Sequence, residues 1–258
     1  MKVLISPISA AEAKIAWECG TDIIDIKNIN EGSLGASFPW IIKEVIESIP
    51  DKNVIFSATL GDLPFKPGTA SLAALGAVTC GVKYVKAGLH GVKTLDEGLQ
   101  LMRAVVRTCK DYDRSVAVVT AGYGDYRRWG GLEPLTLVEI AAESGSDLVM
   151  LDTFIKDGKT LFDNMTEEEL ALFVERAHAS GLAVALAGSV RAEHLEPLAR
   201  MGNDIVGVRG AVCGSYDRAT SIDPHKAREF VRVANALPQT HRASSMGRAP
   251  QAAAGPVV

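Results

Sequence analysis

The sequence predicts a single (β/α)8 barrel of the TIM type, and two observations lead to that fold. Eight short runs rich in Val, Ile and Leu alternate with segments of helical periodicity along 258 residues, and such barrels take roughly 250 residues. The first run is followed by Ser6-Pro7-Ile8-Ser9, without the G-x-G-x-x-G turn typical of an open dinucleotide-binding sheet. We therefore expect one catalytic domain, a closed parallel barrel, over residues 1–237.

The predicted strands are nearly continuous apolar runs, the pattern of a parallel sheet covered on both faces. In chain order they occupy residues 3–8, 22–27, 54–59, 84–89, 115–121, 148–153, 182–187 and 204–209. The predicted helices occupy residues 39–48, 71–81, 94–108, 135–144, 166–180, 191–201 and 224–235. Thr166 and Glu169 form a capping box, and Gly181 is a stop signal. Residues 238–258 are rich in Ala, Ser, Gly and Pro, which predicts a flexible C-terminal tail without a catalytic role.

Composition and charge exclude several classes of protein. Hydrophobic residues make up 47% and charged residues 22% of the chain, a balance typical of folded soluble proteins. The formal net charge of −4 leaves no basic surplus for nucleic acid or an anionic membrane surface. No apolar run approaches the ~20 residues of a membrane-spanning helix. The four cysteines are scattered without a Cys-x-x-Cys pair, so we expect a reduced, cytoplasmic protein that acts on a small molecule.

Charged side chains gather at the ends of three predicted strands, where barrels of this kind build their active sites. Asp25 and Lys27 are two residues apart on the second strand, so both face the barrel interior. Lys86 lies on the fourth strand, Asp152 ends the sixth, and Lys156 follows in the next loop. Buried charges are costly unless they are paired or functional. The five residues therefore predict a catalytic cluster inside the barrel.

The chemistry expected of this cluster is imine formation. Neighbouring ammonium groups lower one another's pKa, and the neutral amine that results can attack a carbonyl group. A lysine beside an aspartate can also be a plain ion pair on a barrel rim. Three lysines on alternate strands share one layer of the interior, and this arrangement favours a Schiff-base enzyme.

The seventh and eighth predicted strands end in motifs that indicate a phosphate site. Gly188 and Ser189 follow the seventh strand, and Arg209 and Gly210 end the eighth. Glycine lets the backbone approach a ligand closely, and amides at the start of a helix donate to anions. No cofactor is expected, and no metal, because neither the histidines nor the cysteines show metal-ligand spacing. The residues alone thus predict a Schiff-base barrel acting on a phosphorylated carbonyl compound.

Six short motifs at these strand ends, taken together, carry a resemblance to a known family. They are Ile24-Asp25-Ile26-Lys27-Asn28, Gly32-Ser33-Leu34-Gly35-Ala36, Val85-Lys86-Ala87-Gly88, Leu151-Asp152-Thr153 with Lys156, Leu186-Ala187-Gly188-Ser189 and Val208-Arg209-Gly210-Ala211-Val212-Cys213. As a set they resemble the (5-formylfuran-3-yl)methyl phosphate synthases of methanofuran biosynthesis, over residues 1–237.

The resemblance implies a reaction and a role for each lysine. In that family a single barrel joins two molecules of glyceraldehyde 3-phosphate into (5-formylfuran-3-yl)methyl phosphate, with loss of phosphate and water. It further implies that Lys27 is the Schiff-base lysine and Lys86 the proton acceptor, assisted by Asp25, Asp152 and Lys156. The furan product follows only from the resemblance.

Other functions remain open from the residues alone. A class I aldolase would use the same imine chemistry. A phosphate-barrel decarboxylase would use an Asp-x-Lys-x-x-Asp relay, which Asp25 and Lys27 fit but in which Asn30 replaces the second carboxylate. The alternative outside enzymes is a barrel that senses a phosphorylated metabolite. Residues 123–129 set arginines beside aromatic residues, and we expect them to cover the substrate or to contact another subunit of a homo-oligomer.

Overall fold

The computed structural model describes residues 1–51 and 53–238, and its strands form a closed parallel barrel. The strands are β1 (Lys2–Ile5), β2 (Ile23–Ile26), β3 (Ile55–Pro64), β4 (Tyr84–Gly91), β5 (Ala117–Tyr123), β6 (Leu148–Asp152), β7 (Ala183–Leu186) and β8 (Ile205–Val208). Each strand pairs with the next along the chain, and β8 pairs back to β1. The predicted fold class is therefore confirmed. The expected tail falls almost wholly on residues 239–258, which lie outside the described residues.

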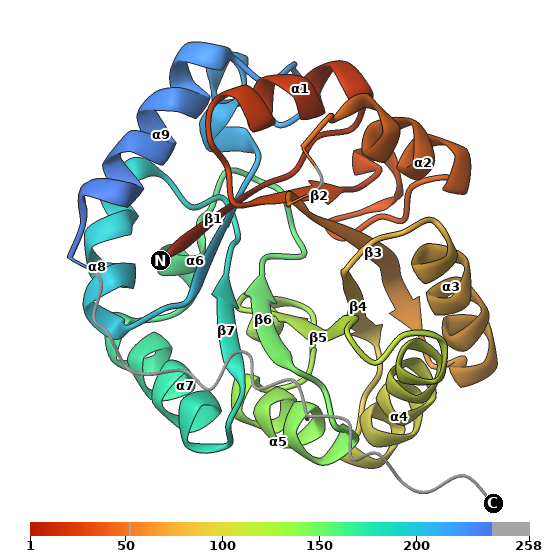
Figure 1. The fold of residues 1–258 in the computed structure, drawn as a ribbon. Helices are drawn as coiled ribbons and strands as arrows, with labels where there is room; N and C mark the ends of the chain where they lie inside the picture. Colours follow the sequence, from red (N-terminus) through yellow and green to blue (C-terminus); the bar gives the residue numbers. More distant parts are fainter. Residues whose placement is uncertain (52, 239–258) are drawn as a thin grey trace, which may run out of the picture.

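Helices form a ring around the strands (Figure 1). They are α1 (Ala10–Glu18), α2 (Pro39–Ser48), α3 (Pro67–Thr79), α4 (Leu95–Tyr112), α5 (Pro134–Ser144), α6 (Leu161–Asn164), α7 (Glu167–Ala179), α8 (Leu195–Met201) and α9 (Pro224–Ala236). Thr166 caps α7 in the predicted capping box with Glu169. None of the described helices is long and apolar enough to cross a membrane.

Two of the differences from the sequence prediction have identifiable reasons. Helix α1 was not predicted, because the face that it buries carries Glu12, Ala13 and Ala16 rather than large apolar residues. Strand β3 continues to Pro64, beyond the predicted end at residue 59, and its register against β4 shifts on both sides of Asp62. This irregularity places the Asp62 carboxylate at the barrel mouth, where it accepts hydrogen bonds from the backbone of Ser33.

Along β2, successive side chains point alternately to the apolar core and to the site. Ile24 and Ile26 belong to the large apolar layer that includes the helices, and Asp25 and Lys27 face the interior cavity. The prediction from the period of two is confirmed. Below the site, a second apolar cluster that includes Leu4, Met150 and Ile205 fills the barrel.

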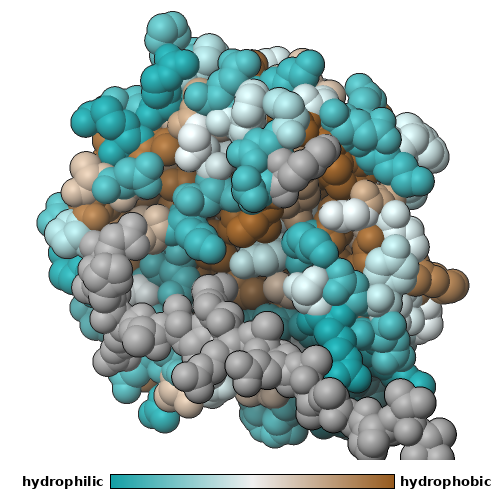
Figure 2. All heavy atoms as spheres, viewed as in Figure 1, coloured by the Kyte–Doolittle hydropathy of each residue, from teal (hydrophilic) through white to brown (hydrophobic). Residues whose placement is uncertain are grey.

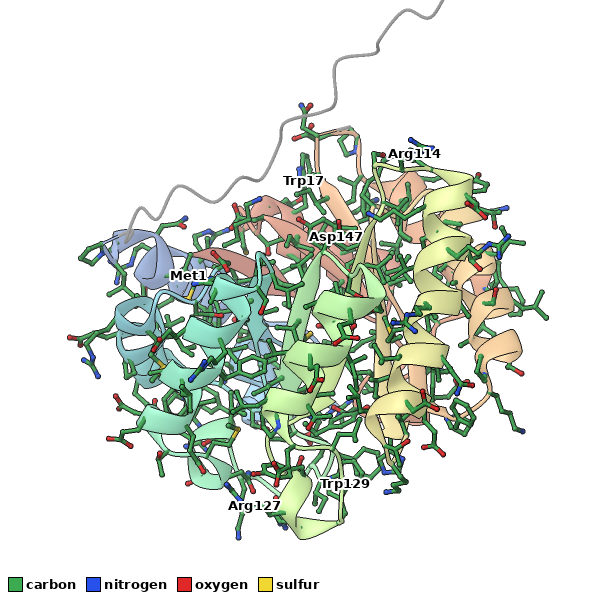
Figure 3. The ribbon with its side chains drawn as sticks, turned by 90° about the horizontal axis from the view of Figure 1, so that it is seen from below. Met1, Trp17, Arg114, Arg127, Trp129 and Asp147 are labelled. Carbon is green, nitrogen blue, oxygen red and sulfur yellow. The ribbon has the colours of Figure 1, made fainter. Side chains whose placement is uncertain are left out.

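The two ends of the barrel are distinct. Arg127 and Trp129 lie at the end where the strands terminate, and Met1, Arg114 and Asp147 lie at the opposite end (Figure 3). On the face seen in Figure 2, polar side chains predominate, with small apolar areas between them. The charged residues singled out from the sequence are at the end that carries Arg127 and Trp129, as expected for a barrel of this fold.

Candidate active site

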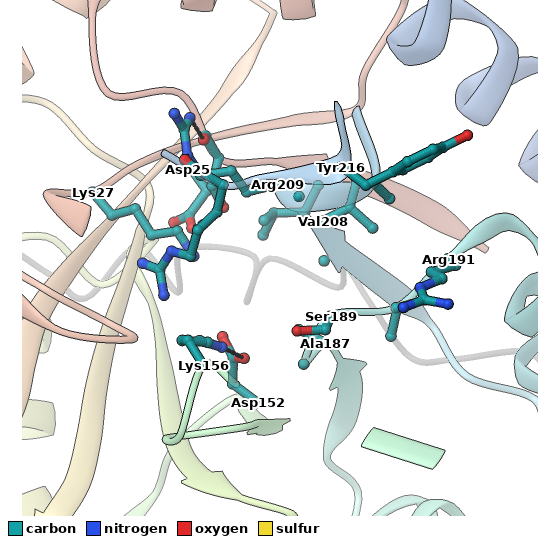
Figure 4. Close-up of a pocket in the computed structure, with 18 of the residues that line it drawn as sticks. Asp25, Lys27, Asp152, Lys156, Ala187, Ser189, Arg191, Val208, Arg209 and Tyr216 are labelled. Carbon is teal, nitrogen blue, oxygen red and sulfur yellow. Dashed lines mark hydrogen bonds and ion pairs between the residues drawn. The ribbon is translucent and has the colours of Figure 1, made fainter. Parts of the chain in front are cut away.

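A cavity of about 320 Å³ opens at the C-terminal ends of the strands (Figure 4). It is lined by every residue that the sequence predicted for the site except Lys86: Asp25, Lys27, Asp152, Lys156, Gly188, Ser189, Arg209 and Gly210. Figure 4 shows Lys27 and Lys156 facing the cavity on one side, and Ser189 on the other. Parts of the chain more than 180 residues apart thus contribute to one cavity.

Lys27 is the buried amine at the centre of this arrangement. It follows β2 directly, only 7% of it is exposed, and its Nζ donates to the backbone oxygen of Ser33 at 3.4 Å. Burial lowers the pKa of Lys27 to about 8; Asp152 and Asp25 oppose the shift, while Lys86 and Lys156 add to it. The sequence argument relied on repulsion between ammonium groups, but burial is the larger cause. A usable fraction of the amine is neutral near pH 7.

Lys86 and Asp25 form an ion pair beneath the cavity. Lys86 Nζ lies 2.6 Å from Asp25 Oδ2, and both side chains are buried. Ser6 Oγ donates to the same carboxylate oxygen at 2.9 Å. Asp25 Oδ1 and Lys86 Nζ have no well-aligned hydrogen-bond partner among the described residues. The pair is held together by charge, with Asp25 lining the cavity and Lys86 below it.

Asp152 and Lys156 form the second ion pair, on the side of β6. Lys156 Nζ lies 2.7 Å from Asp152 Oδ1 and also donates to Thr153 Oγ1 at 3.2 Å. Burial alone would raise the pKa of Asp152, but Lys156 and Lys27 hold it well below its ordinary value. Asp152 is therefore a carboxylate throughout the neutral range. Of the three lysines, Lys27 alone has no carboxylate within 4.0 Å in the described part of the chain.

The β7 side of the cavity is built from backbone. Gly188 has φ +98°, and a Cβ there would lie 2.9 Å from Thr153 Cγ2 and 3.0 Å from Thr153 N. The next residue, Ser189, also has a positive φ of 52°. Only glycine takes the first conformation at low cost and leaves room for the chain that ends β6. The predicted Gly-Ser motif therefore shapes a tight turn that faces the cavity.

Arg209 lines the cavity, but its guanidinium is already engaged. Its five N–H groups donate to the backbone oxygens of Ser6, Arg218 and Thr220 and to both carboxylate oxygens of Glu12. The Glu12 ion pair is 2.7 Å long and buried. Arg209 thus joins the end of β8 to α1 and to the loop after Cys213. Phosphate binding by its guanidinium stays a prediction, and it would require some of these bonds to break.

Sequence reasoning missed His90 and Phe154, two members of an aromatic cluster at the barrel mouth. The His90 ring stacks on Phe154 with centroids 3.8 Å apart and lies 4.6 Å from Trp129. Tyr123 donates a hydrogen bond to Asp62 below them. Trp129 belongs to the segment predicted to cover the site, but His90 and Phe154 carried no signal, since isolated aromatic residues are common in any core.

Arg218 was also missed, and it too lines the cavity. Its Nη2 donates to the backbone oxygen of Gly32 at 3.0 Å. Within residues 1–51 and 53–238, no group of three or more His, Cys, Asp or Glu side chains is arranged to hold a metal ion. The cavity is lined by two lysines, three aspartates and three arginines, a set suited to imine chemistry on an anionic substrate.

Comparison with known proteins identifies the family. The 4-HFC-P synthase family model matches residues 3–231. The chain is 55% identical over 218 residues to the (5-formylfuran-3-yl)methyl phosphate synthase of Methanocaldococcus jannaschii, covering 84% of this chain and 92% of that one. It is 54% identical over 220 residues to the enzyme of the same name from Methanothermobacter thermautotrophicus, covering 85% and 92%.

Among solved structures the similarity concerns the fold. A 3-hexulose-6-phosphate synthase matches with a TM-score of 0.64 and 18% sequence identity, covering 91% of this chain and 99% of that one. The family match, by contrast, spans residues 3–231, which contain the lysine and glycine motifs. The chain belongs to the 4-HFC-P synthase family.

Proposed function

We propose that this protein is a (5-formylfuran-3-yl)methyl phosphate synthase that joins two molecules of glyceraldehyde 3-phosphate through an imine on Lys27. The names of its relatives support the reaction. One structural observation carries the mechanism: Lys27 presents a buried amine to the cavity with a pKa lowered to about 8, whereas Lys86 and Lys156 are each paired with a carboxylate. The lysine with the most accessible lone pair is the nucleophile.

The first step uses the neutral Lys27 amine. Its nitrogen attacks the aldehyde carbon, and water leaves as the imine forms, which makes the proton on the adjacent carbon acidic. Removal of that proton is assigned to the Lys86–Asp25 pair. Lys86 is the member of the pair that we assign as the proton acceptor, and its Nζ lies 2.6 Å from Asp25 Oδ2. The enamine that results adds to the aldehyde of the second triose phosphate.

The second ion pair serves the later steps. Loss of phosphate and water places negative charge on departing oxygen atoms, which a proton donor stabilises. Lys156 is the donor we assign to this role, because its amine lines the cavity beside Lys27 and is held by Asp152 at 2.7 Å. The backbone turn at Gly188 and Ser189, with Gly210, binds one of the two phosphate groups.

The alternatives differ in what they predict for the same residues. A class I aldolase would form the imine and release no phosphate. A decarboxylase relay needs a carboxylate at position 30, and Asn30 is an exposed amide on a short 3-10 turn. A sensor would bind glyceraldehyde 3-phosphate without consuming it.

The test is a measurement of products with the full chain. Glyceraldehyde 3-phosphate alone should yield inorganic phosphate and the furan aldehyde in equal amounts, and Lys27→Arg should yield neither. Lys14→Arg, an exposed lysine on α1, is the matched control and should keep full activity. Consumption without phosphate release would support the aldolase. Activity that a chelator abolishes and a divalent ion restores would contradict the metal-free mechanism that the sequence predicts.

A further inference from the structure

The loop that follows β8 is a closed strap over one side of the cavity; we define the strap as residues 213–222. An antiparallel bridge between Cys213 and Ile222 closes its base. Ser215 and Tyr216 both have positive φ values, 50° and 58°. Non-glycine residues persist in this conformation only where their surroundings hold them. The strap therefore has a defined shape, and Figure 4 shows Tyr216 beside the cavity.

Arg209 holds the strap from beneath. Its Nε donates to the backbone oxygen of Arg218 at 2.7 Å, and its Nη2 donates to that of Thr220 at 3.1 Å. The same guanidinium is anchored to Glu12 on α1. The hydrogen bonds of Arg209 thus fix the backbone position of Arg218. Arg209 is a positioning residue for Arg218.

Arg218 brings its guanidinium to the cavity wall, and within the described part of the chain only one of its donors is engaged. It is half-buried and lines the cavity, and its described hydrogen bond is the one from Nη2 to the Gly32 oxygen. No carboxylate of the described residues lies within 4.0 Å of it. Asp217, the nearest acid in sequence, accepts a hydrogen bond from Ala219 within the strap, and Asp152 is paired with Lys156. Asp152 and Asp62 act on Arg218 only at longer range, and a guanidinium without a carboxylate in contact favours an anionic ligand.

Arg218 lies on the Lys27 side of the cavity. Gly32 O accepts from Arg218, and Ser33 O accepts from Lys27. These are consecutive residues, and consecutive Cα atoms are about 3.8 Å apart. The guanidinium and the amine are therefore bound to neighbouring peptide groups, within reach of the two ends of one small molecule.

We propose that Arg218 binds the phosphate of the triose phosphate whose aldehyde is held on Lys27. The inference rests on the proposed function, in which two phosphate groups occupy the cavity together. The glycine turn after β7 provides one set of donors, and the strap provides the other. A planar guanidinium binds this phosphate through paired N–H···O bonds and offsets its negative charge while the imine forms.

The test compares two aldehydes that differ in the phosphate. Imine formation is measured as borohydride-trapped adduct against the concentration of glyceraldehyde 3-phosphate or of glyceraldehyde. Arg218→Gln should raise the half-saturating concentration of glyceraldehyde 3-phosphate about tenfold to a hundredfold and leave that of glyceraldehyde unchanged. Arg218→Lys, which keeps the charge, should lose less. Arg114→Gln, at the opposite end of the barrel, should change neither value.

The outcomes separate this inference from the proposed function. An unchanged value for glyceraldehyde 3-phosphate in Arg218→Gln, or an equal loss for both aldehydes, would overturn the role of Arg218. If the wild type forms no adduct, the proposed function fails, and calorimetry with inorganic phosphate decides about Arg218 separately. Arg218→Gln should then bind one phosphate ion fewer than the wild type, and unchanged stoichiometry and affinity would overturn the inference.

Discussion

The two sides of the barrel mouth provide chemistry in different ways. The lysine side, at the ends of β2, β4 and β6, buries four charged side chains and adds the partly exposed Lys156, and two ion pairs of 2.6 and 2.7 Å neutralise most of that charge. The glycine side, after β7 and β8, faces the cavity with backbone at Gly188, Ser189 and Gly210. The lysine side supplies reactive side chains, and the glycine side supplies the backbone that shapes the cavity wall.

The two sides differ in what they cost the folded state. A pKa of Lys27 lowered from 10.5 to about 8 corresponds to about 3 kcal/mol at neutral pH, because the ammonium form is disfavoured in the folded protein. Gly188 takes its positive φ at little cost. Reactivity at Lys27 is thus obtained at the expense of stability, whereas the turn at Gly188 costs the folded state little. Substitutions on the lysine side should therefore act on turnover and stability, and those on the glycine side should act on KM.

The largest expected effect is on turnover, at Lys86. Lys86→Arg keeps the charge beside Asp25 but cannot accept a proton, so turnover should fall by about 100-fold to 10,000-fold. Trapping of the imine on Lys27 should persist, because Lys86 acts after the imine forms. Phosphate release and adduct mass are the measurements. Lys83→Arg, on an exposed lysine paired with Asp113, should leave both unchanged, and parallel loss of adduct and turnover in Lys86→Arg would contradict the assigned order.

The next effect is on stability, at Lys27. Lys27→Met should be more stable than the wild type by about 3 kcal/mol below pH 8, measured by urea unfolding. The unfolded chain binds the proton more tightly than the folded one, so the wild type gains stability as pH rises from about 8 to 10.5. The difference between the two proteins should shrink over that interval. If Lys27→Met is less stable than the wild type at pH 7, the buried amine does not lower the free energy of unfolding.

The smallest effect is expected on the glycine side. Gly188→Ala places a Cβ against Thr153, so it should shift the turn and raise the KM for glyceraldehyde 3-phosphate about tenfold, with a stability loss of about 1–3 kcal/mol. Gly181→Ala is the matched control, since Gly181 also has a positive φ but nothing lies within 4 Å of its added Cβ. Gly181→Ala should lower stability and leave the KM unchanged. An unchanged KM in Gly188→Ala would show that the turn does not take part in phosphate binding.

The sequence predicts the features that depend on local pattern. Strand positions follow from apolar runs, and the inward direction of Asp25 and Lys27 follows from their spacing on β2. It could not place Lys86 beneath the cavity rather than in its lining, because depth along a barrel depends on the stagger of neighbouring strands.

The two arginines show a second limit. Arg209 and Arg218 are nine residues apart and equally polar in sequence. Glu12, which binds Arg209, is 197 residues away and becomes its neighbour only because β8 pairs with β1. Barrel closure therefore decides that Arg209 pairs with a carboxylate while Arg218, among the described residues, does not. The local sequence carries no signal for this difference.

The identity of the imine lysine is the central claim, and borohydride trapping tests it most directly. The full chain is incubated with glyceraldehyde 3-phosphate and borohydride from pH 6 to pH 10, and the modified peptide is identified by mass. The adduct should lie on Lys27, and its rate of formation should rise about tenfold per pH unit and level off near pH 8, where the amine becomes neutral. An adduct on Lys86 or Lys156 with Lys27 unmodified would contradict the account.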